Sequence, residues 1–387
     1  MTLAQAARAA AVPPFHAMAM SRAASEREAA GNEVLHLEVG QPSTPAPAGA
    51  RQAAIASLER GEALGYTNAA GLMSLRLRIA RHYDDWYGID VSPNELIAVA
   101  GASAGFTLAF AAAFDAGDRV GVIEPGYPCY RNTLLALGIE PVPIAVDQRT
   151  RWAPTADALD RAGRLDGLIV ASPSNPTGTV LSTASLREIV GWCTANSVQL
   201  ISDEIYHGIV FDGRADSVRS FDAEAIIINS FSKYFSMTGW RLGWMVVPAH
   251  LTDAIERLQQ NLYICAPHIS QVAGIAAFDC TQELDANVAR YRANRTVLLD
   301  GLAAAGMTDV ASADGAFYVY ADVGHMTQRF GGDSMRLCTR WLNELGVACT
   351  PGLDFDLARG QHTVRFSYAG HAADLMQACE RIAEWSP

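Results

Sequence analysis

Residues 225–244 read AIIINSFSKYFSMTGWRLGW. The three isoleucines form a short, continuous β-branched run, which is typical of a strand covered on both faces. Such strands belong to mostly parallel sheets, and open sheets of this kind bind ligands beyond the carboxyl ends of their strands. The run therefore predicts that Lys233 lies on a loop at the ligand-binding edge of a sheet.

Lys233 has two interpretations from these residues alone. Aromatic neighbours would partly desolvate its amine and lower the pKa, as a nucleophile that attacks a carbonyl requires. Ser230, Ser232, Ser236 and Arg241 carry hydrogen-bond donors suited to an anion such as a phosphate. Together they describe a Schiff-base lysine beside a phosphate site. The alternative, a surface lysine and a structural arginine, stays open at this point.

Composition limits the class of protein. At 387 residues the chain is longer than one compact core usually serves, so we expect two domains. Hydrophobic residues make up 50% and charged residues 18%, as in a well-buried globular protein. A net charge of −12 without a basic cluster argues against a nucleic-acid partner. No stretch reaches the ~20 apolar residues of a membrane span.

The cysteines and the N-terminal residues bear on location. Seven cysteines are dispersed without a Cys-x-x-Cys pair, which indicates reduced thiols in a cytoplasmic protein. No spacing of His, Cys, Asp and Glu suggests a metal site. Residues 1–25 contain arginines and no acid, as in a targeting segment, but Pro13-Pro14 and His16 interrupt any apolar run. We interpret this segment as mature sequence.

From residue 95 the sequence alternates strand and helix patterns for about half the chain. Strands are expected at 96–100, 119–124, 142–146, 166–171 and 198–203, with helices between them, and residues 33–39 before this region also alternate like a strand. This alternation predicts an α/β fold with a mostly parallel, doubly wound sheet. Beyond residue 248 helices dominate, and short strands near 316–321 and 363–368 indicate a smaller α+β domain. We expect a large domain at 41–284 and a small domain formed by 1–40 and 285–387.

Two turns follow strands of this predicted sheet. In Gly101-Ala102-Ser103-Ala104-Gly105, small residues and a helix N-terminus would let backbone N–H groups approach an anion, although such turns occur in most α/β proteins. In Ser172-Pro173-Ser174-Asn175-Pro176-Thr177-Gly178, two prolines direct the Asn175 amide outward, which suits a hydrogen bond to a ligand. A plain turn is the alternative for the second segment.

Asp203 ends the strand expected at 198–203, and Tyr206 follows three residues later. A carboxylate at the carboxyl end of a buried strand is placed like a catalytic or cofactor residue, and it could pair with a protonated ring nitrogen. Tyr206 could donate a phenolic hydrogen bond. A helix N-cap is the alternative for Asp203.

These segments share a pattern with a known family. Asn-Pro-x-Gly, Asp-x-x-Tyr, and Ser-x-x-Lys followed eight residues later by Arg resemble the fold-type I pyridoxal-phosphate enzymes, specifically the class I/II aminotransferases. The similarity runs from about residue 40 to residue 365. It implies pyridoxal 5′-phosphate as cofactor and transfer of the amino group of an L-amino acid to a 2-oxo acid.

The resemblance implies a role for each matching residue. Lys233 would form the internal aldimine and move a proton, and Asp203 would keep the cofactor's ring nitrogen protonated. The other implied cofactor contacts are Tyr206 and Asn175 at the 3′-oxygen, Tyr127 on the ring face, and Ala102, Ser103, Ser230 and Arg241 at the phosphate. Tyr66 would reach the phosphate from a second subunit, which implies a homodimer.

The resemblance extends to the substrate. Arg365 matches the family's arginine for the α-carboxylate, where a bidentate fork suits the chemistry, and Gly40 and Asn175 would line the same end. Residues 351–356, PGLDFD, depart from the family pattern, which leaves open how this loop contacts the substrate. We assign no arginine to a second substrate carboxylate, so the identity of the amino acid stays open.

The same residues leave two other functions open. A lyase or synthase that eliminates at Cβ or Cγ shares the same motifs. A regulatory protein could retain the cofactor pocket without turnover, but the chain is short for an added DNA-binding domain and its charge is acidic.

Overall fold

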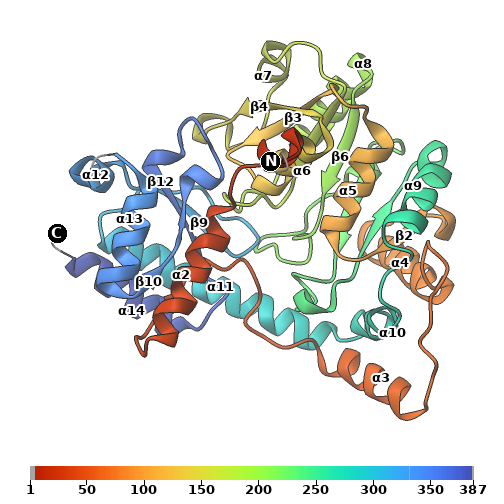
Figure 1. Ribbon diagram of the computed structural model, residues 1–387, viewed down its shortest axis with the longest axis horizontal. Coiled ribbons are helices and arrows are strands. Elements are labelled where there is room, and N and C mark those ends of the chain that lie inside the picture. Colours follow the sequence, from red (N-terminus) through yellow and green to blue (C-terminus); the bar gives the residue numbers. More distant parts are fainter. Residues whose placement is uncertain (1–4, 331, 386–387) are drawn as a thin grey trace, which may run out of the picture.

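The computed structural model describes residues 5–330 and 332–385 (Figure 1). A seven-stranded sheet in the order β2-β8-β7-β6-β5-β3-β4 lies at the centre of the larger part. Its strands are β2 (Leu96–Val99), β3 (Arg119–Glu124), β4 (Glu140–Ala145), β5 (Gly167–Ala171), β6 (Gln199–Asp203), β7 (Ile226–Ser230) and β8 (Gly243–Val246). Only β8 runs antiparallel to its neighbours β2 and β7. The predicted mostly parallel α/β sheet is confirmed.

The isoleucine run explains why β7 lies inside the sheet. Ile226, Ile227 and Ile228 are each fully buried. Ile227 packs in one hydrophobic cluster, whereas Ile226 and Ile228 pack in the other. Since successive side chains of a strand point to opposite faces, both faces of β7 are covered, and the run is continuous rather than alternating.

Helices cover both faces of this sheet (Figure 1). One hydrophobic cluster joins the sheet to α5 (Ala102–Ala113), α6 (Pro128–Leu137) and α9 (Ala249–Leu262). The other joins it to α4 (Met73–Tyr87), α8 (Thr183–Asn196) and α10 (His268–Ala277). The short α7 (Ala156–Arg161) and α3 (Ala48–Glu59) complete this part of the chain. Within the described residues no helix is both long and apolar enough to cross a bilayer.

The C-terminal elements and the N-terminal residues form a second, smaller part of the molecule, built around its own sheet. β11 (Thr350–Pro351), β12 (Thr363–Ser367) and β9 (Tyr318–Asp322) form an antiparallel sheet. Its helices are α11 (Thr281–Ala304), α12 (Gly324–Thr327), α13 (Ser334–Arg340) and α14 (Ala372–Glu384), and a π-helical turn spans Trp341–Leu345. α2 (His16–Ala29), which follows the short α1 (Ala7–Ala10), packs against β11 of this sheet (Figure 1).

The strand expected at residues 33–39 is shorter than predicted. Only β1 (Leu35–His36) pairs, in parallel, with β10 (Val347–Ala348). Beyond it the Glu38 carbonyl accepts hydrogen bonds from the side chains of Arg365 and Thr350 instead of a neighbouring strand. Side-chain partners therefore end the strand pairing and bring this segment to the edge of the central sheet.

Candidate active site

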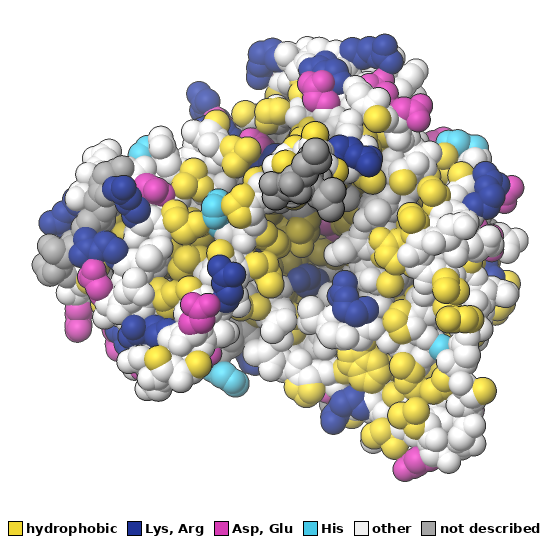
Figure 2. Space-filling model, viewed as in Figure 1, with side chains coloured by type: hydrophobic (Ala, Val, Ile, Leu, Met, Phe, Trp, Pro, Cys, Tyr) yellow, Lys and Arg dark blue, Asp and Glu magenta, His cyan; other side chains and the backbone are white. Residues whose placement is uncertain are grey.

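A cavity of about 500 Å³ opens at the carboxyl ends of the central strands. Ala171 of β5, Asp203 of β6 and Ser230 of β7, each the last residue of its strand, line it. Figure 2 shows the molecule hollowed near its centre, with hydrophobic side chains around the hollow and basic side chains in and beside it. The cavity therefore lies at the edge of the sheet where the sequence predicts a ligand site.

Lys233 lines the cavity from the loop between β7 and the short helix η4 (Thr238–Trp240). It keeps partial exposure because it faces this space, and its Nζ donates a hydrogen bond to the Gly40 carbonyl at 2.6 Å. The amine lies 5.5 Å from the centroid of the Tyr206 ring. Burial of the amine, and then the charge of Arg365, lower the pKa of Lys233 to about 8. A fraction of the amine is therefore neutral at physiological pH.

Lys233 is also the only lysine in the 387-residue chain, which has 29 lysine and arginine residues together. All the remaining residues in this set are arginine. Arginine carries charge as well as lysine does, but its guanidinium cannot act as an amine nucleophile in a protein. The single retained lysine therefore indicates a position where amine chemistry, and not positive charge, is required.

Asp203 forms the polar floor of the cavity and is 3% exposed. Its Oδ1 accepts a hydrogen bond from the Ile205 backbone N–H at 3.1 Å, and its Oδ2 accepts one from the Tyr130 hydroxyl. Burial raises the pKa of Asp203 to about 6, against the effect of these hydrogen bonds. The group is a buried carboxylate at neutral pH. No helix begins there, which removes the N-cap alternative.

Arg365 of β12 enters the cavity from the opposite side and is 4% exposed. Its Nη1 donates to Asn175 Oδ1 at 2.9 Å, and its Nη2 donates to the Glu38 carbonyl at 2.6 Å and to Thr350 Oγ1 at 3.2 Å. The guanidinium carbon lies 4.3 Å from the Tyr318 ring centroid. Among the described residues the buried Nε of Arg365 has no hydrogen-bond partner. An anionic ligand would supply the missing acceptor.

The turn at Gly101 forms the anion end of the cavity. Gly101 has φ +83°, and a Cβ placed there would collide with the Arg241 guanidinium. Ala102 and Ser103 begin α5 and line the cavity, so unpaired N–H groups of the helix N-terminus lie beside Arg241. Ser230 lines the same end, and its hydroxyl donates to the Leu242 carbonyl at 3.1 Å.

Two tyrosine side chains predicted as cofactor contacts also line the cavity. Tyr127 precedes α6, and its ring meets Phe15 edge to face at a centroid distance of 6.1 Å. The Tyr206 hydroxyl lies 2.7 Å from that of Tyr318. Gly40 and Asn175 complete the predicted set within this space.

Two predicted ligand contacts lie elsewhere in the single chain. Tyr66 is 83% exposed and is not among the described residues that line the cavity. Ser236 is also outside that set, and its hydroxyl lies 2.9 Å from Thr44 Oγ1. Ser236 has φ +53°, which turns the chain toward η4 and carries its side chain away from the serines before it.

Some residues of the site were not identified from the sequence. Tyr130, Phe15 and Met18 line the cavity, and Tyr130 bonds directly to Asp203. Tyr130 follows Tyr127 by one helical turn, a spacing that could have placed both rings on the same side of α6. The N-terminal helix carries no comparable signal. The uniqueness of Lys233 was readable in the sequence and is more specific than any single motif.

Comparisons with known proteins cover nearly the whole chain. The family model described as aminotransferase class I and II matches residues 32–382. The valine–pyruvate aminotransferase of Mycobacterium tuberculosis is 47% identical over 97% of this chain and 97% of that protein. The (5-formylfuran-3-yl)methyl phosphate transaminase of Methanocaldococcus jannaschii is 34% identical over 96% of each. The crystal structure of an aminotransferase from Mycobacterium tuberculosis matches with a TM-score of 0.95, 47% identity and 99% coverage of both chains.

Proposed function

Because this chain belongs to the class I and II aminotransferase family and catalyses pyridoxal-phosphate-dependent transamination of amino acids, we propose that Lys233 is its catalytic residue. The observation that carries the assignment is the position of the only lysine in the chain, in one cavity with the Asp203 carboxylate and the Arg365 guanidinium. The lowered pKa of Lys233 supports it, since a neutral amine is the reactive form.

The cavity fits pyridoxal 5′-phosphate by the chemistry of its side chains. A buried carboxylate at Asp203 suits a protonated ring nitrogen, and the N-terminus of α5 beside Arg241 suits a phosphate. When bound, the cofactor supplies an aldehyde for the amino group and a ring that withdraws electrons. The residues that would hold it are Lys233, Asp203, Asn175, Tyr206, Tyr127, Ala102, Ser103, Ser230 and Arg241.

Three side chains would perform the work of transamination on the substrate. Arg365 binds the α-carboxylate through its planar fork and fixes the orientation of the α-carbon. Lys233 Nζ would accept the proton from that carbon and deliver it to the carbon of the cofactor's aldehyde group. Asp203 keeps its negative charge at the wall of the cavity and would stabilise positive charge on the ring nitrogen of a bound cofactor. Gly40 and Asn175 would line the carboxylate end beside Arg365.

The lining of the cavity favours an amino donor with an uncharged, apolar side chain. Among the described residues that line it, the only lysine and arginine side chains are Lys233, Arg241 and Arg365. All three already have proposed roles, so this subunit offers no further basic side chain for a second substrate carboxylate. Phe15, Met18 and Val39 supply apolar surface in the same cavity. The name of the 47% identical relative, a valine–pyruvate aminotransferase, is consistent with this class of amino donor.

We also propose how the enzyme assembles and where in the cell it acts. Tyr66 would complete the phosphate site of a second subunit, which requires a homodimer. Its exposure supports this role, because an exposed aromatic side chain in a loop is available to a partner. We propose a cytoplasmic enzyme whose large domain spans 41–284 and whose small domain combines 1–40 with 285–387.

Half-reactions of the cofactor-loaded enzyme test this function. Without a 2-oxo acid, an apolar amino acid such as L-valine should convert the bound cofactor to its amine form and change its absorbance, and pyruvate should reverse the change. Arg365→Ala should keep the starting absorbance and lose most of the response, because it removes the grip on the carboxylate. Release of ammonia without any 2-oxo acid acceptor would contradict transamination.

A further inference from the structure

The loop that departs from the family pattern holds the N-terminal helix. Asp354 of this loop is 2% exposed. Its Oδ1 accepts a hydrogen bond from the His16 backbone N–H at 3.0 Å, and its Oδ2 accepts one from that of Ala17 at 2.9 Å. These residues begin α2, and Phe15 at the helix N-cap gives no side-chain cap. Asp354 therefore caps a helix that is 338 residues away in sequence, with its charge at the positive end of that helix.

The first turns of α2 form part of the active-site cavity. Phe15, Ala17, Met18 and Ser21 line the same space as Lys233 and Arg365. The Phe15 ring packs edge to face against Tyr127. Whatever fixes the start of α2 therefore also fixes the distance between its apolar side chains and the reacting groups.

The loop is in turn bonded to the central sheet. The Gly126 N–H donates to the Phe355 carbonyl at 3.0 Å, next to Tyr127. Arg131 of α6 donates to the Asp354 carbonyl at 3.3 Å and forms an ion pair with Glu124 at 2.9 Å. Residues at the ligand-binding edge of the sheet therefore hold Asp354 in place.

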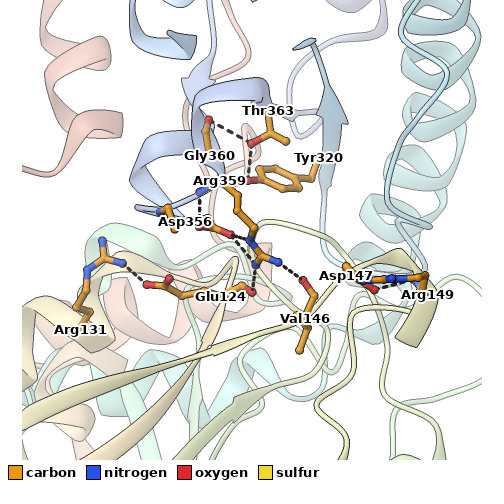
Figure 3. A network of polar contacts seen from close by, with 11 residues as sticks. Glu124, Arg131, Val146, Asp147, Arg149, Tyr320, Asp356, Arg359, Gly360 and Thr363 are labelled. Carbon is orange, nitrogen blue, oxygen red and sulfur yellow. Dashed lines mark hydrogen bonds and ion pairs between the residues drawn. The ribbon is translucent and has the colours of Figure 1, made fainter. Parts of the chain in front are cut away.

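Arg359 adds a second attachment of the same loop (Figure 3). Its Nη2 donates to the Glu124 carbonyl at 2.7 Å and its Nη1 to the Val146 carbonyl at 3.2 Å. Asp356 pairs with its Nε at 2.7 Å, which holds the guanidinium between the ends of β3 and β4. The loop is therefore fixed at Asp354 and on its C-terminal side.

We propose that Asp354 is a positioning residue that holds the first turn of α2 as a wall of the substrate cavity, and that Phe15 and Met18 thereby select the amino donor. The inference rests on the proposed transamination. Without the carboxylate, the N–H groups of His16 and Ala17 lose their acceptor, and the first turn of α2 is free to shift. The departure from the family pattern at 351–356 then has a definite consequence, because it anchors the helix.

Steady-state kinetics of the cofactor-loaded Asp354→Asn and Asp354→Ala variants test this role. For L-valine and L-leucine we expect KM to rise about tenfold in Asp354→Ala, the effect of losing one helix cap, and to rise less in Asp354→Asn, whose amide oxygen still accepts one of the two N–H groups. For L-alanine, whose methyl group presents little surface to α2, we expect KM within about twofold of the wild type. The absorbance of the bound cofactor should not change, since Asp354 is not among its proposed contacts.

Asp333→Ala is the matched control. Asp333 caps α13 in the same way, with Oδ1 accepting the Met335 N–H at 2.8 Å, and it is not among the described residues that line the cavity. It should leave the preference among amino donors unchanged. An equal rise in KM for all three amino donors with Asp354→Ala, or no rise, would overturn the proposal.

Met18→Ala and limited proteolysis supply independent readouts. If Asp354 acts through α2, the effects of Asp354→Ala and Met18→Ala on KM for L-leucine should not add. Trypsin should cleave after Arg22, an exposed residue of α2, faster in Asp354→Ala than in the wild type or Asp333→Ala. Additive effects, or unchanged cleavage, would refute the role of Asp354. Absence of transamination by the wild type with every amino donor would refute the proposed function, while the cleavage assay would still decide the role of Asp354.

Discussion

At Lys233, burial and the positive charges of Arg365 and Arg241 lower the pKa of the amine, while the Asp203 carboxylate raises it. The arginines that would bind the two anionic ends of the reactants therefore also prepare the lysine for reaction. Asp203 limits this effect and keeps the pKa at about 8. An amine with this pKa can serve as nucleophile and as base near neutral pH.

This pKa predicts how fast the cofactor-free protein takes up its cofactor at different pH. Only the neutral amine attacks the aldehyde, so the rate of covalent attachment should rise about tenfold per pH unit below the pKa and level off above it. The change of slope should fall at about 8, measured by rapid-mixing absorbance. A rate that keeps rising up to pH 10.5, the ordinary pKa of lysine, would contradict the environment described for Lys233.

The residues of the site differ in how far the sequence could reveal them. Asn175, Asp203, Lys233 and Arg241 follow strand ends at fixed offsets, so a linear pattern identified them and the structure brings them into one cavity. Tyr130 bonds to Asp203 across two separate elements. No offset in the sequence encodes that contact, because it depends on how α6 packs on the sheet.

At the level of elements, the turn before α5 is built around one close approach. Gly101→Ala should weaken cofactor binding at least tenfold, because its Cβ would displace the Arg241 guanidinium. The positive φ adds a cost of about 1 kcal/mol to stability. Gly61→Ala is the control, since Gly61 has φ +68° with nothing within 4 Å of a Cβ, and it should lose stability only. Cofactor titration and thermal unfolding measure both; equal cofactor affinity in the two variants would contradict this role of Gly101.

The side-chain bridge between α2 and β1 predicts that the free energy of unfolding depends on pH. His36 bridges Glu28 of α2, at 3.1 Å, and Glu38, at 2.9 Å, and the Glu38 hydrogen bond is the main cause that raises the pKa of His36 to about 9. A raised pKa means that the bridge stabilises fully below the ordinary value of 6.5 and loses this effect as pH rises through about 9.

His36→Gln measures this contribution. The wild type should unfold at a temperature higher by roughly 1–2 °C than the variant near pH 6, because the pair is partly exposed, and the difference should vanish above about pH 9.5. His250→Gln removes a pair with Glu224 whose side chains are 57% and 71% exposed, and it is the control for replacing a histidine at the surface. A constant difference between wild type and His36→Gln at all pH values would refute the bridge.

The elements themselves were largely predictable because strand and helix periodicities alternate clearly in the central region. The strand expected at 33–39 was too long, since side-chain hydrogen bonds to Glu38 replace strand pairing there. The Asp354 cap could not be predicted, because its partners lie at opposite ends of the chain and only tertiary packing brings them together.

For the whole molecule, the exposed loop at Tyr66 is the feature that a single chain does not explain. Tyr66 borders a concave surface with Tyr263 and Ile264, and Ile264 is 47% exposed. Exposed apolar side chains around a hollow are typical of an interface. This surface supports the proposed homodimer, in which Tyr66 would serve the site of the partner.

Subunit mixing tests the shared site. Lys233→Ala and Tyr66→Ala damage the same site from different subunits if Tyr66 acts across the interface. Random exchange then gives half mixed dimers with one intact site each, so about a quarter of all sites should regain wild-type cofactor affinity and turnover. Activity equal to the mean of the two parent proteins would contradict the exchange of Tyr66 between subunits.

The central claim is that the amine of Lys233 carries the cofactor, and borohydride reduction of the loaded enzyme tests it most directly. Because the chain has one lysine, the reagent can fix the cofactor on only one side-chain amine. Peptide mass spectrometry should find the added mass on the peptide that contains Lys233, and Lys233→Arg should carry none. Absence of covalent label in the wild type, or label confined to the N-terminal amine, would contradict the account.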